Sequence, residues 1–501
     1  MYFLYLFIIF IFIINISFIV NNNNKEIVTN QILSVFNWTK IEFFDEKKNE
    51  TIECLNCIPS IIKFYKNRLF VSFPRYNIEN EITFAYYNED KSAFIPYPDY
   101  ESNKLNYSNN INNNDDNIHL KSVNGFEIDE ENNILYILDN GRIENNKTIY
   151  KDNICLYIFN LKDERKKAKK IINFNHYNIS LDTSNLINFA VDISKNIAYV
   201  LDSGNPFLDN KTNSSSLKLS DYHPALLIVY INENPEDIKI YRILEDRKEF
   251  YPDFSYWIKI NDNKLYKNFP YYFGINGITL DCSFNTLYFS SISSRKIYSI
   301  LTKTIEKYIN KNIINKKEGN FYDIEIYENY KEESSDGILA SRNKKLYFTG
   351  LESGSIYIAK KVDVDLIRFT TKKIIQIKGN NTIKWPNSLT FKDNSVYFLS
   401  NQKNIYIQNN YINIYNNKND DSSDEYYFKL LRYDLGEKDY SYIKKCTSNE
   451  KEFKTTIIVW ILFSIIIMIV LSFVFMGSGK QDEIYDKKNI KLISKKKEKI
   501  K

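Results

Sequence analysis

Residues 124–139 read NGFEIDEENNILYILD. The stretch contains an apolar strand, a short polar turn and a second strand built around a tyrosine. Each half alternates between apolar and polar positions with the period of a β-strand, and the Asn- and Glu-rich centre is typical of a turn. The stretch therefore predicts a β-hairpin, which cannot bury both of its faces alone.

The same pattern occurs five more times along the chain. The other copies read SIIKFYKNRLFVSF (60–73), NFAVDISKNIAYVLD (188–202), NGITLDCSFNTLYFSS (276–291), DGILASRNKKLYFTG (336–350) and NSLTFKDNSVYFLS (387–400). Successive copies begin roughly 50 to 90 residues apart, and several run on into a third strand such as KIYSI or SIYIA. Tandem four-stranded sheets arranged radially would bury these faces, so residues 30–446 are predicted to form an all-β, six-bladed β-propeller. A β-sandwich does not explain six copies in one register.

Three further segments belong to this plan. Residues 102–117 and 409–425 are rich in Asn, Asp and Ser and are predicted to be loop insertions. Residues 32–44 (ILSVFNWTKIEFF) read as a strand ahead of the first repeat. We expect this strand to complete the last blade and close the ring, so that no sheet edge remains free.

The two ends of the chain predict its location. Residues 455–477 carry no charge and have the length of a membrane-spanning helix, and the lysine-rich tail 478–501 that follows marks the cytosolic side. Residues 1–21 are predicted to be a signal peptide, or an uncleaved anchor, because no basic residue precedes the apolar run and no Ala-x-Ala-like site follows it. The sequence thus predicts a single-pass membrane protein with its propeller extracellular or luminal, at the cell surface or in a secretory organelle.

The charge of the chain argues against nucleic acid as a partner. Downstream of Ser478, nine lysines stand against four acids, and this tail accounts for the whole net charge of +5. Of the 67 basic and 62 acidic residues, 58 of each remain in the rest of the chain. A neutral body lacks the basic surface that phosphate binding needs.

The cysteines indicate disulfides more than metal. They are Cys54, Cys57, Cys155, Cys282 and Cys446. In an oxidising compartment some of them should pair, and the odd number leaves one thiol over. Cys54 and Cys57 resemble half of a zinc site, but no second Cys-x-x-Cys occurs and the three histidines are dispersed.

An ordered series of motifs resembles the major royal jelly protein and yellow family. The matching pieces include VFNWTKIEF, NRLFVSFPRYN, EIDEENNILYILDNGR, AVDISKNIAYVLDSG, SSDGILASRNKKLYFTG and WPNSLTFKDNSVYFLSN, spread over about residues 36–401. The resemblance implies a secreted six-bladed propeller from a functionally diverse group. Members are linked to dopachrome conversion, to binding of biogenic amines in the propeller channel, and to sterol-bound nutritional oligomers. The C-terminal anchor and the Asn-Gly that opens the fourth repeat depart from the family pattern.

The first residue of each repeat is polar. These residues are Ser60, Asn124, Asn188, Asn276, Asp336 and Asn387. Since the innermost strand of each blade lines the central channel, we expect a ring of six side chains suited to a polar ligand or a hard cation. The alternative is that Asn, Asp and Ser simply favour the start of a strand.

The ring also resembles that of the calcium-binding lactonases and arylesterases of the gluconolactonase kind. There, Asn and Asp at such positions and a first-blade glutamate hold the metal, and Asn124, Asn276 and Asp336 stand at matching positions. Ser60 stands where the glutamate is expected, so the ring offers a divalent ion one formal charge. Calcium at these three residues is the metal alternative, and no other cofactor is implied.

Two functional classes follow. One is a binding protein for a small ligand, amine-like in character, or for a partner protein. The other is an enzyme acting at the channel, either a calcium-dependent lactonase or esterase or a dopachrome-converting enzyme. His119, His176 and His223 fall in predicted loops, and neither Gly-x-Ser-x-Gly nor His-Glu-x-x-His occurs. We therefore favour binding over catalysis.

Overall fold

The structure is a computed structural model of the 501-residue chain. It describes residues 31–105, 118–143, 148–177, 179–204, 223–232, 234, 237–260, 263–265, 273–315, 324–360, 374–377, 383–404, 427–435, 439, 441–443 and 466–467. The N-terminal segment 1–21, the insertion 409–425 and the tail 478–501 lie outside these residues, as does most of 455–477. The chain divides into two units, residues 1–445 and 446–501, and the propeller lies within the first.

Six sheets form the blades, and each contains four antiparallel strands ordered from an inner strand outward. Blade 1 contains β4 (Ile62–Tyr65), β5 (Arg68–Ser72), β6 (Phe84–Asn88) and β7 (Ala93–Pro96); blade 2 contains β8 (Val123–Asp129), β9 (Ile134–Asp139), β12 (Cys155–Asn160) and β13 (Ala168–Asn173). Blade 3 contains β14 (Leu186–Asp192), β15 (Ile197–Asp202), β16 (Ala225–Tyr230) and β17 (Lys239–Ile243); blade 4 contains β20 (Ile275–Leu280), β21 (Thr286–Ser291), β22 (Lys296–Leu301) and β23 (Tyr327–Tyr330). Blade 5 contains β24 (Ile338–Ala340), β25 (Lys345–Gly350), β26 (Ser355–Lys360) and β27 (Ile374–Ile377); blade 6 contains β28 (Trp385–Lys392), β29 (Ser395–Asn401), β30 (Phe428–Asp434) and β1 (Leu33–Trp38).

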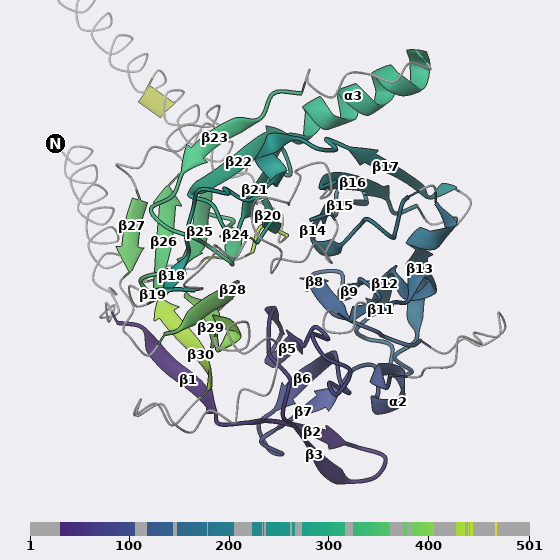
Figure 1. Cartoon of the computed structure of the whole chain (residues 1–501), viewed down its shortest axis with the longest axis vertical. Coiled ribbons are helices and arrows are strands. Elements are labelled where there is room, and N and C mark those ends of the chain that lie inside the picture. Colours follow the sequence, from purple (N-terminus) through teal and green to yellow (C-terminus); the bar gives the residue numbers. More distant parts are fainter. Residues whose placement is uncertain are drawn as a thin grey trace, which may run out of the picture. The chain divides into compact units, whose positions relative to one another are not determined.

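The blades form a closed ring. Figure 1 shows the sheets around a common centre, with β8, β14, β20, β24 and β28 nearest to it. Each inner strand contacts the inner strand of the next blade, and β28 contacts β4. The six-bladed propeller predicted from the repeats is therefore the fold of this part of the chain.

Residues 32–44 divide between two blades, which corrects the sequence prediction. Only β1 completes the last blade, pairing with β30 from Leu33–Arg432 to Trp38–Phe428. Because a bend at residues 39–40 follows, β2 (Ile41–Asp45) enters blade 1 instead and runs parallel to β7. There it forms a hairpin with β3 (Glu50–Cys54), so blade 1 has six strands. The ring is thus closed by one N-terminal strand beside three C-terminal ones.

The core lies between the blades. The aromatic residue at the centre of each second strand is buried in every blade. These residues are Phe70, Tyr136, Tyr199, Tyr288, Tyr347 and Tyr397. They pack with Ile, Leu and Val of adjacent strands, so the aromatic that recurs in the sequence repeat is the residue that packs each sheet against its neighbours.

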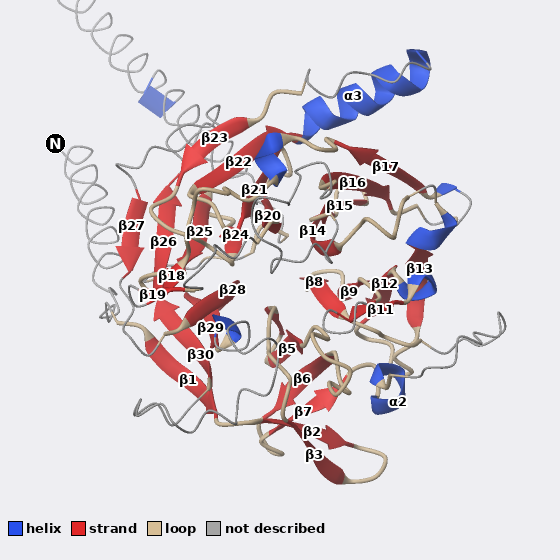
Figure 2. Ribbon diagram, in the orientation of Figure 1, coloured by secondary structure: helices blue, strands red, loops and turns tan. Residues whose placement is uncertain are grey.

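In the part of the chain that the structure describes, helices are few, and the longer ones, α2 and α3, lie at the periphery (Figure 2). They are α2 (Tyr100–Asn103), α3 (Thr302–Asn315) and short 3₁₀ turns at Lys151–Asn153, Phe174–His176 and Lys248–Phe250; two small ladders, β10 (Arg142–Ile143) with β11 (Thr148–Ile149) and β18 (Lys259–Ile260) with β19 (Asn263–Lys264), complete the elements. Ser102, expected in a loop, instead lies within α2. Among the helices that the structure describes, none has the length and apolar character needed to span a bilayer.

Candidate functional site

The ring residues lie where the inner strands begin, and four of these strands are irregular there. The pairing register shifts between Val123 and Gly125 in β8 and between Ile275 and Gly277 in β20. Equivalent shifts occur in β14 and β28. Such bulges redirect a side chain and are frequent beside functional sites. We call the side of the propeller where inner strands begin and second strands end the ring face.

Hydrogen bonds link the ring residues across blades. The Asn188 amide donates to the Asn276 carbonyl at 3.0 Å, and the Asn276 amide donates to Asp336 Oδ1 at 2.6 Å. On the other side of the ring, the Asn387 amide donates to Ser60 Oγ at 3.3 Å. The structure therefore brings these five residues together in two bonded groups.

Asn124 lies beside the first of these groups. A side-chain carbon added to Gly125 would lie 3.2 Å from the Asn188 backbone, so a larger residue there would push β8 and β14 apart by a few tenths of an ångström. The buried Asn124 Oδ1 has no hydrogen-bond partner among the described residues. All six predicted ring positions therefore lie at or just before the start of an inner strand.

Asp336 is the charged centre of this arrangement. Its carboxylate is almost completely buried, with 1% of the side chain exposed. Besides the Asn276 amide, it accepts a hydrogen bond from Trp385 Nε1 at 2.6 Å. Lys403 Nζ lies 3.9 Å from Asp336 Oδ2, which makes Lys403 its ionic partner.

Three aromatic rings surround the same ammonium group. Lys403 Nζ lies 5.4 Å from the ring centroid of Phe273, 5.9 Å from that of Tyr76 and 6.0 Å from that of Trp385. Phe273 and Trp385 also pack edge to face, with centroids 5.8 Å apart. Tyr76, Phe273, Asp336 and Trp385 form what we call the Asp336 box. Rings at this distance attract a cation through their negative faces.

Four different blades supply the box, and the topology explains why they meet. Phe273, Asp336 and Trp385 precede or begin the inner strands of blades 4, 5 and 6. Tyr76 follows β5 and Lys403 follows β29, both of which are second strands. Starts of inner strands and ends of antiparallel second strands lie on the same side of a propeller, here the ring face.

The opposite end of the inner strands is joined by Tyr442. Its side chain is completely buried, and burial raises the pKa of its hydroxyl. The hydroxyl accepts a hydrogen bond from the Val191 amide at 3.0 Å, and the Tyr442 amide donates to the Ala340 carbonyl at 3.1 Å. Its ring contacts Phe284, 6.5 Å away, so one residue links blades 3, 4 and 5.

A buried lysine lies in blade 4, apart from the box. Lys331 Nζ donates to Ser290 Oγ at 2.8 Å and to the Ser291 carbonyl at 3.2 Å. Burial lowers the pKa of Lys331 to about 7, partly offset by Asp336 and Glu333. A lysine beside a serine can activate a nucleophile, but both side chains are only 2% exposed. The pair is therefore closed to a substrate.

The ring does not provide a good coordination set for calcium. Its single carboxylate, Asp336, is already engaged by two N–H donors and the Lys403 ammonium. Calcium prefers six to eight oxygen ligands with several carboxylates among them. Among the described residues, one group of three potential metal ligands occurs elsewhere, at His223, Glu245 and Asp246, and its two acids are exposed.

The described cysteines are either disulfide-bonded or free. Cys54 and Cys57 form a disulfide at the end of β3. Cys282 is disulfide-bonded, Cys155 is a buried free thiol, and Cys446 lies outside the described residues. The disulfide of Cys54 and Cys57 occupies both sulfurs that a zinc site would need.

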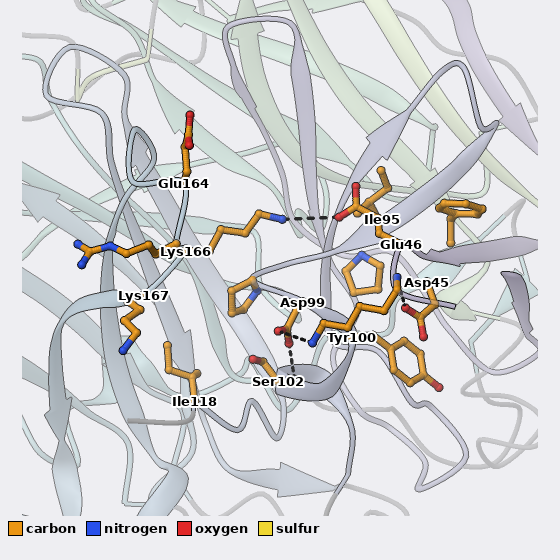
Figure 3. Close-up of a pocket in the computed structure, with 15 residues that line it drawn as sticks. Asp45, Glu46, Ile95, Asp99, Tyr100, Ser102, Ile118, Glu164, Lys166 and Lys167 are labelled. Atoms are coloured by element: carbon orange, nitrogen blue, oxygen red, sulfur yellow. Dashed lines mark hydrogen bonds and ion pairs between the residues drawn. The ribbon is translucent and has the colours of Figure 1, made fainter. Parts of the chain in front are cut away.

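A surface cavity of about 360 Å³ lies away from the ring, at the outer edges of blades 1 and 2. Figure 3 shows Asp45, Glu46 and Tyr100 on one side of it and Glu164, Lys166 and Lys167 on the other. Four acidic and four basic side chains line it, and pairs such as Lys166 with Glu46, 3.8 Å apart, connect them. The cavity thus carries no net charge that would select a ligand.

Sequence reasoning located Asp336 but missed the three aromatic members of the box and the lysine that they surround. Tyr76, Phe273, Trp385 and Lys403 lie in or beside loops, outside the period of the repeat. The available sequence indication was an aromatic residue just before a ring position, as in Phe273 before Asn276 and Trp385 before Asn387.

Comparison with known proteins agrees with the motif series. The family model of the major royal jelly protein matches residues 121–425, more than half of the chain. No curated protein matches significantly. A luciferin-regenerating enzyme structure is similar with a TM-score of 0.39 at 9% identity, covering 80% of this chain and 94% of its own. The Cps50 (Swd1) β-propeller domain of Myceliophteria thermophila gives a TM-score of 0.37 at 8% identity, with coverage of 75% and 96%.

Proposed function

The chain belongs to the major royal jelly protein family, and on that premise we propose that it is a membrane-anchored propeller that binds a small organic ammonium ligand at the Asp336 box. The ligand class is an amine with an apolar or aromatic body. In this proposal the uncharged segment 455–477 is the anchor, and the lysine-rich tail that follows it supports an extracellular or luminal propeller.

One observation carries the proposal: the box already surrounds an ammonium group. A buried carboxylate lies on one side of Lys403 Nζ, and rings from three further blades lie around it. A cation between aromatic rings gains about 0.5 to 2 kcal/mol, more where water is excluded. This is the chemistry that recognises an amine, whereas a metal ion would need more oxygen ligands than Asp336 supplies.

We place catalysis second. Calcium-dependent hydrolysis and dopachrome conversion both need groups that can move protons or hold a metal at the ring. Within the described residues, Asp336 is the one carboxylate of the ring, and His119, His176 and His223 come from segments outside the inner strands. A partner protein on the outer loops is the other binding alternative.

Calorimetry on the full-length chain in detergent micelles tests this proposal. We expect an arylalkylamine such as tyramine to bind the wild type, and Asp336→Asn to weaken binding about tenfold or more, because a hydrogen bond to a charged group contributes about 1.5 to 3 kcal/mol. Asp163→Asn, a change at a half-buried aspartate in the β12–β13 loop away from the ring, is the matched control and should bind as the wild type.

A second variant covers the case in which Asp336→Asn fails to fold. Phe273→Leu keeps an apolar side chain but removes one ring, so it should weaken binding of the amine and leave thermal stability nearly unchanged. Added calcium or a chelator should have no effect on the melting temperature. If wild type, Asp336→Asn and Phe273→Leu bound the amine with equal affinity, the amine would not bind at the Asp336 box.

A further inference from the structure

Lys403 occupies the position that the proposed ligand would need. Its ammonium contacts the Asp336 carboxylate and three rings, and 13% of its side chain is exposed. An external amine cannot make these contacts while the lysine makes them. Resting on the function proposed above, we propose that Lys403 is a displaceable internal ligand that sets the specificity of the box.

The backbone of Lys403 is held by hydrogen bonds that do not involve its side chain. Asn401 Oδ1 accepts a hydrogen bond from the Lys403 amide at 3.1 Å, and the Asn401 amide donates to the Pro59 carbonyl at 3.0 Å. These bonds anchor the segment where blade 6 meets blade 1. Lys403 Nζ lies 3.9 Å from Asp336 Oδ2, so this contact is an ion pair without a hydrogen bond. Because the bonds at Asn401 do not depend on the ammonium group, a change of the Lys403 rotamer keeps its backbone in place.

Asp336 remains satisfied when the lysine leaves. Trp385 Nε1 and the Asn276 amide still donate to its two oxygens, each at 2.6 Å. The carboxylate would therefore stay in place, and an incoming ammonium would replace the one that was lost. Displacement exchanges one cation for another and leaves no buried charge unpaired.

This exchange selects among amines. A simple alkylammonium ion gains only the contacts that Lys403 gives up, and it must also lose its freedom in solution. An amine with an aromatic body gains further contacts with the box and can overcome the lysine. An amine can bind only in the fraction of molecules in which the Lys403 side chain is outside the box. Its apparent affinity is therefore lowered in proportion to that fraction. Lys403 thus excludes small alkylammonium ions in favour of larger amines.

Removing the lysine side chain should reverse this selection. In the full-length chain, we expect Lys403→Ala to bind n-butylammonium, a mimic of the missing side chain, about tenfold or more tightly than the wild type does by calorimetry. The ion should also raise the melting temperature of Lys403→Ala and leave that of the wild type unchanged. Neutral n-pentanol should do neither, since it lacks the charge that the box recognises.

Two controls make the result specific. Lys392→Ala removes a lysine at the other end of β28, where Lys392 Nζ lies over the Phe64 ring, and should bind n-butylammonium as the wild type does. Lys403→Arg keeps a cation in the box and should keep the exclusion. If Lys403→Ala unfolds, Lys403→Gln, which keeps length without charge, replaces it in the same comparison.

The outcomes separate this inference from the proposed function. Equal affinity of wild type and Lys403→Ala for n-butylammonium would overturn the internal ligand. Tighter binding by Lys403→Ala that disappears when Asp336→Asn is added would establish it. If that gain appears while wild type binds no arylalkylamine, the internal ligand stands and the proposed amine function fails.

Discussion

Asp139 and Asp202 end the second strands of blades 2 and 3, and each holds the loop ahead of the inner strand of its own blade. Asp139 accepts hydrogen bonds from the Ser122 and Gly141 amides, both at 2.8 Å. Asp202 accepts them from Asn185 at 2.7 Å and Gly204 at 2.8 Å. The motifs ILDNG and VLDSG, which carried much of the family resemblance, therefore fix the backbone that leads into the ring.

In blades 1 and 5, a serine and a threonine hold the backbone at the start of the inner strand. Ser72 Oγ accepts a hydrogen bond from the Ile61 amide at 3.1 Å. Thr349 Oγ1 accepts bonds from the Asp336 and Gly337 amides at 3.3 and 3.0 Å. The side chain that places the only ring carboxylate is thus a buried threonine on the neighbouring strand, and nothing in the sequence repeat marks it as special.

Lys331 makes stability depend on pH. Burial lowers its pKa in the folded protein to about 7, below the ordinary lysine value of 10.5. Between these two values the unfolded chain holds one more proton, so the free energy of unfolding rises with pH across that window by up to about 1.4 kcal/mol per pH unit. Below about pH 7 both states are protonated and the full penalty is present.

Lys331→Met should remove this dependence. We expect the difference in unfolding free energy, wild type minus variant, to increase steadily from pH 7 to 10 in urea titrations and to be flat below pH 7. Lys248→Met, at an exposed position, should leave the wild-type profile unchanged. A difference independent of pH would mean that Lys331 titrates normally in the folded protein.

At the scale of elements, the six hairpins were predictable because their period is local. Alternation, turn residues and the central aromatic lie within about 15 residues, and the structure confirms six blades. The path of residues 32–44 was not predictable to the same degree. Both halves are apolar strands, and only tertiary pairing assigns β1 to β30 and β2 to β7. The box combines residues from four blades, and the aromatic residue just before a ring position is the one local sign of it.

Closure by β1 can be tested by deletion. Without β1, β30 becomes the outer edge of blade 6 and exposes unpaired backbone groups along its length. We expect a chain lacking β1 to aggregate on size-exclusion chromatography or to melt at a markedly lower temperature. Val35→Lys, which changes an exposed residue of β1, should stay soluble and melt like the wild type. A soluble, equally heat-stable deletion would show that blade 6 closes without this strand.

For the propeller as a whole, the two ends of the inner strands differ. The ring face carries the Asp336 box, while Tyr442 ties blades 3, 4 and 5 together at the other end. The consequence is that a small ligand meets polar and aromatic groups at one end and a packed tyrosine at the other. We therefore expect substitutions at Tyr442 to change stability and substitutions in the box to change binding.

Two substitutions at Tyr442 measure how much this residue contributes to the free energy of unfolding. Tyr442→Phe leaves the Val191 amide without its acceptor and should lower the free energy of unfolding by about 1 to 3 kcal/mol. Tyr442→Ala also leaves a cavity and should cost about 3 to 5 kcal/mol, as for other large aromatic residues. Tyr330→Phe is the control, because Tyr330 is 57% exposed and should change stability little. Urea unfolding of all three variants provides the comparison, and an unchanged Tyr442→Ala would show that this end is not packed in solution.

We predict that the whole protein is anchored in a membrane by residues 455–477, with the nine lysines that follow Ser478 on the cytosolic side. A charged side chain at the centre of a spanning helix costs about 2.5 to 3.5 kcal/mol, so an uncharged run of this length favours insertion, and the lysine excess favours a cytosolic tail. One epitope inserted after Lys48, in the exposed β2–β3 turn, and another after Lys501 report the two sides. The test adds protease to intact cells if the protein is at the cell surface, or to intact organelle vesicles if it is in an internal membrane.

The protease cuts only the part of the chain outside the closed membrane. On cells this is the extracellular part, and on vesicles it is the cytosolic part. On cells we expect loss of the Lys48 epitope and survival of the Lys501 epitope, with the reverse on vesicles, and loss of both once detergent opens the membrane. Protection of the propeller epitope on cells together with loss of the C-terminal one would invert the orientation, and loss of both from intact cells would remove the anchor altogether.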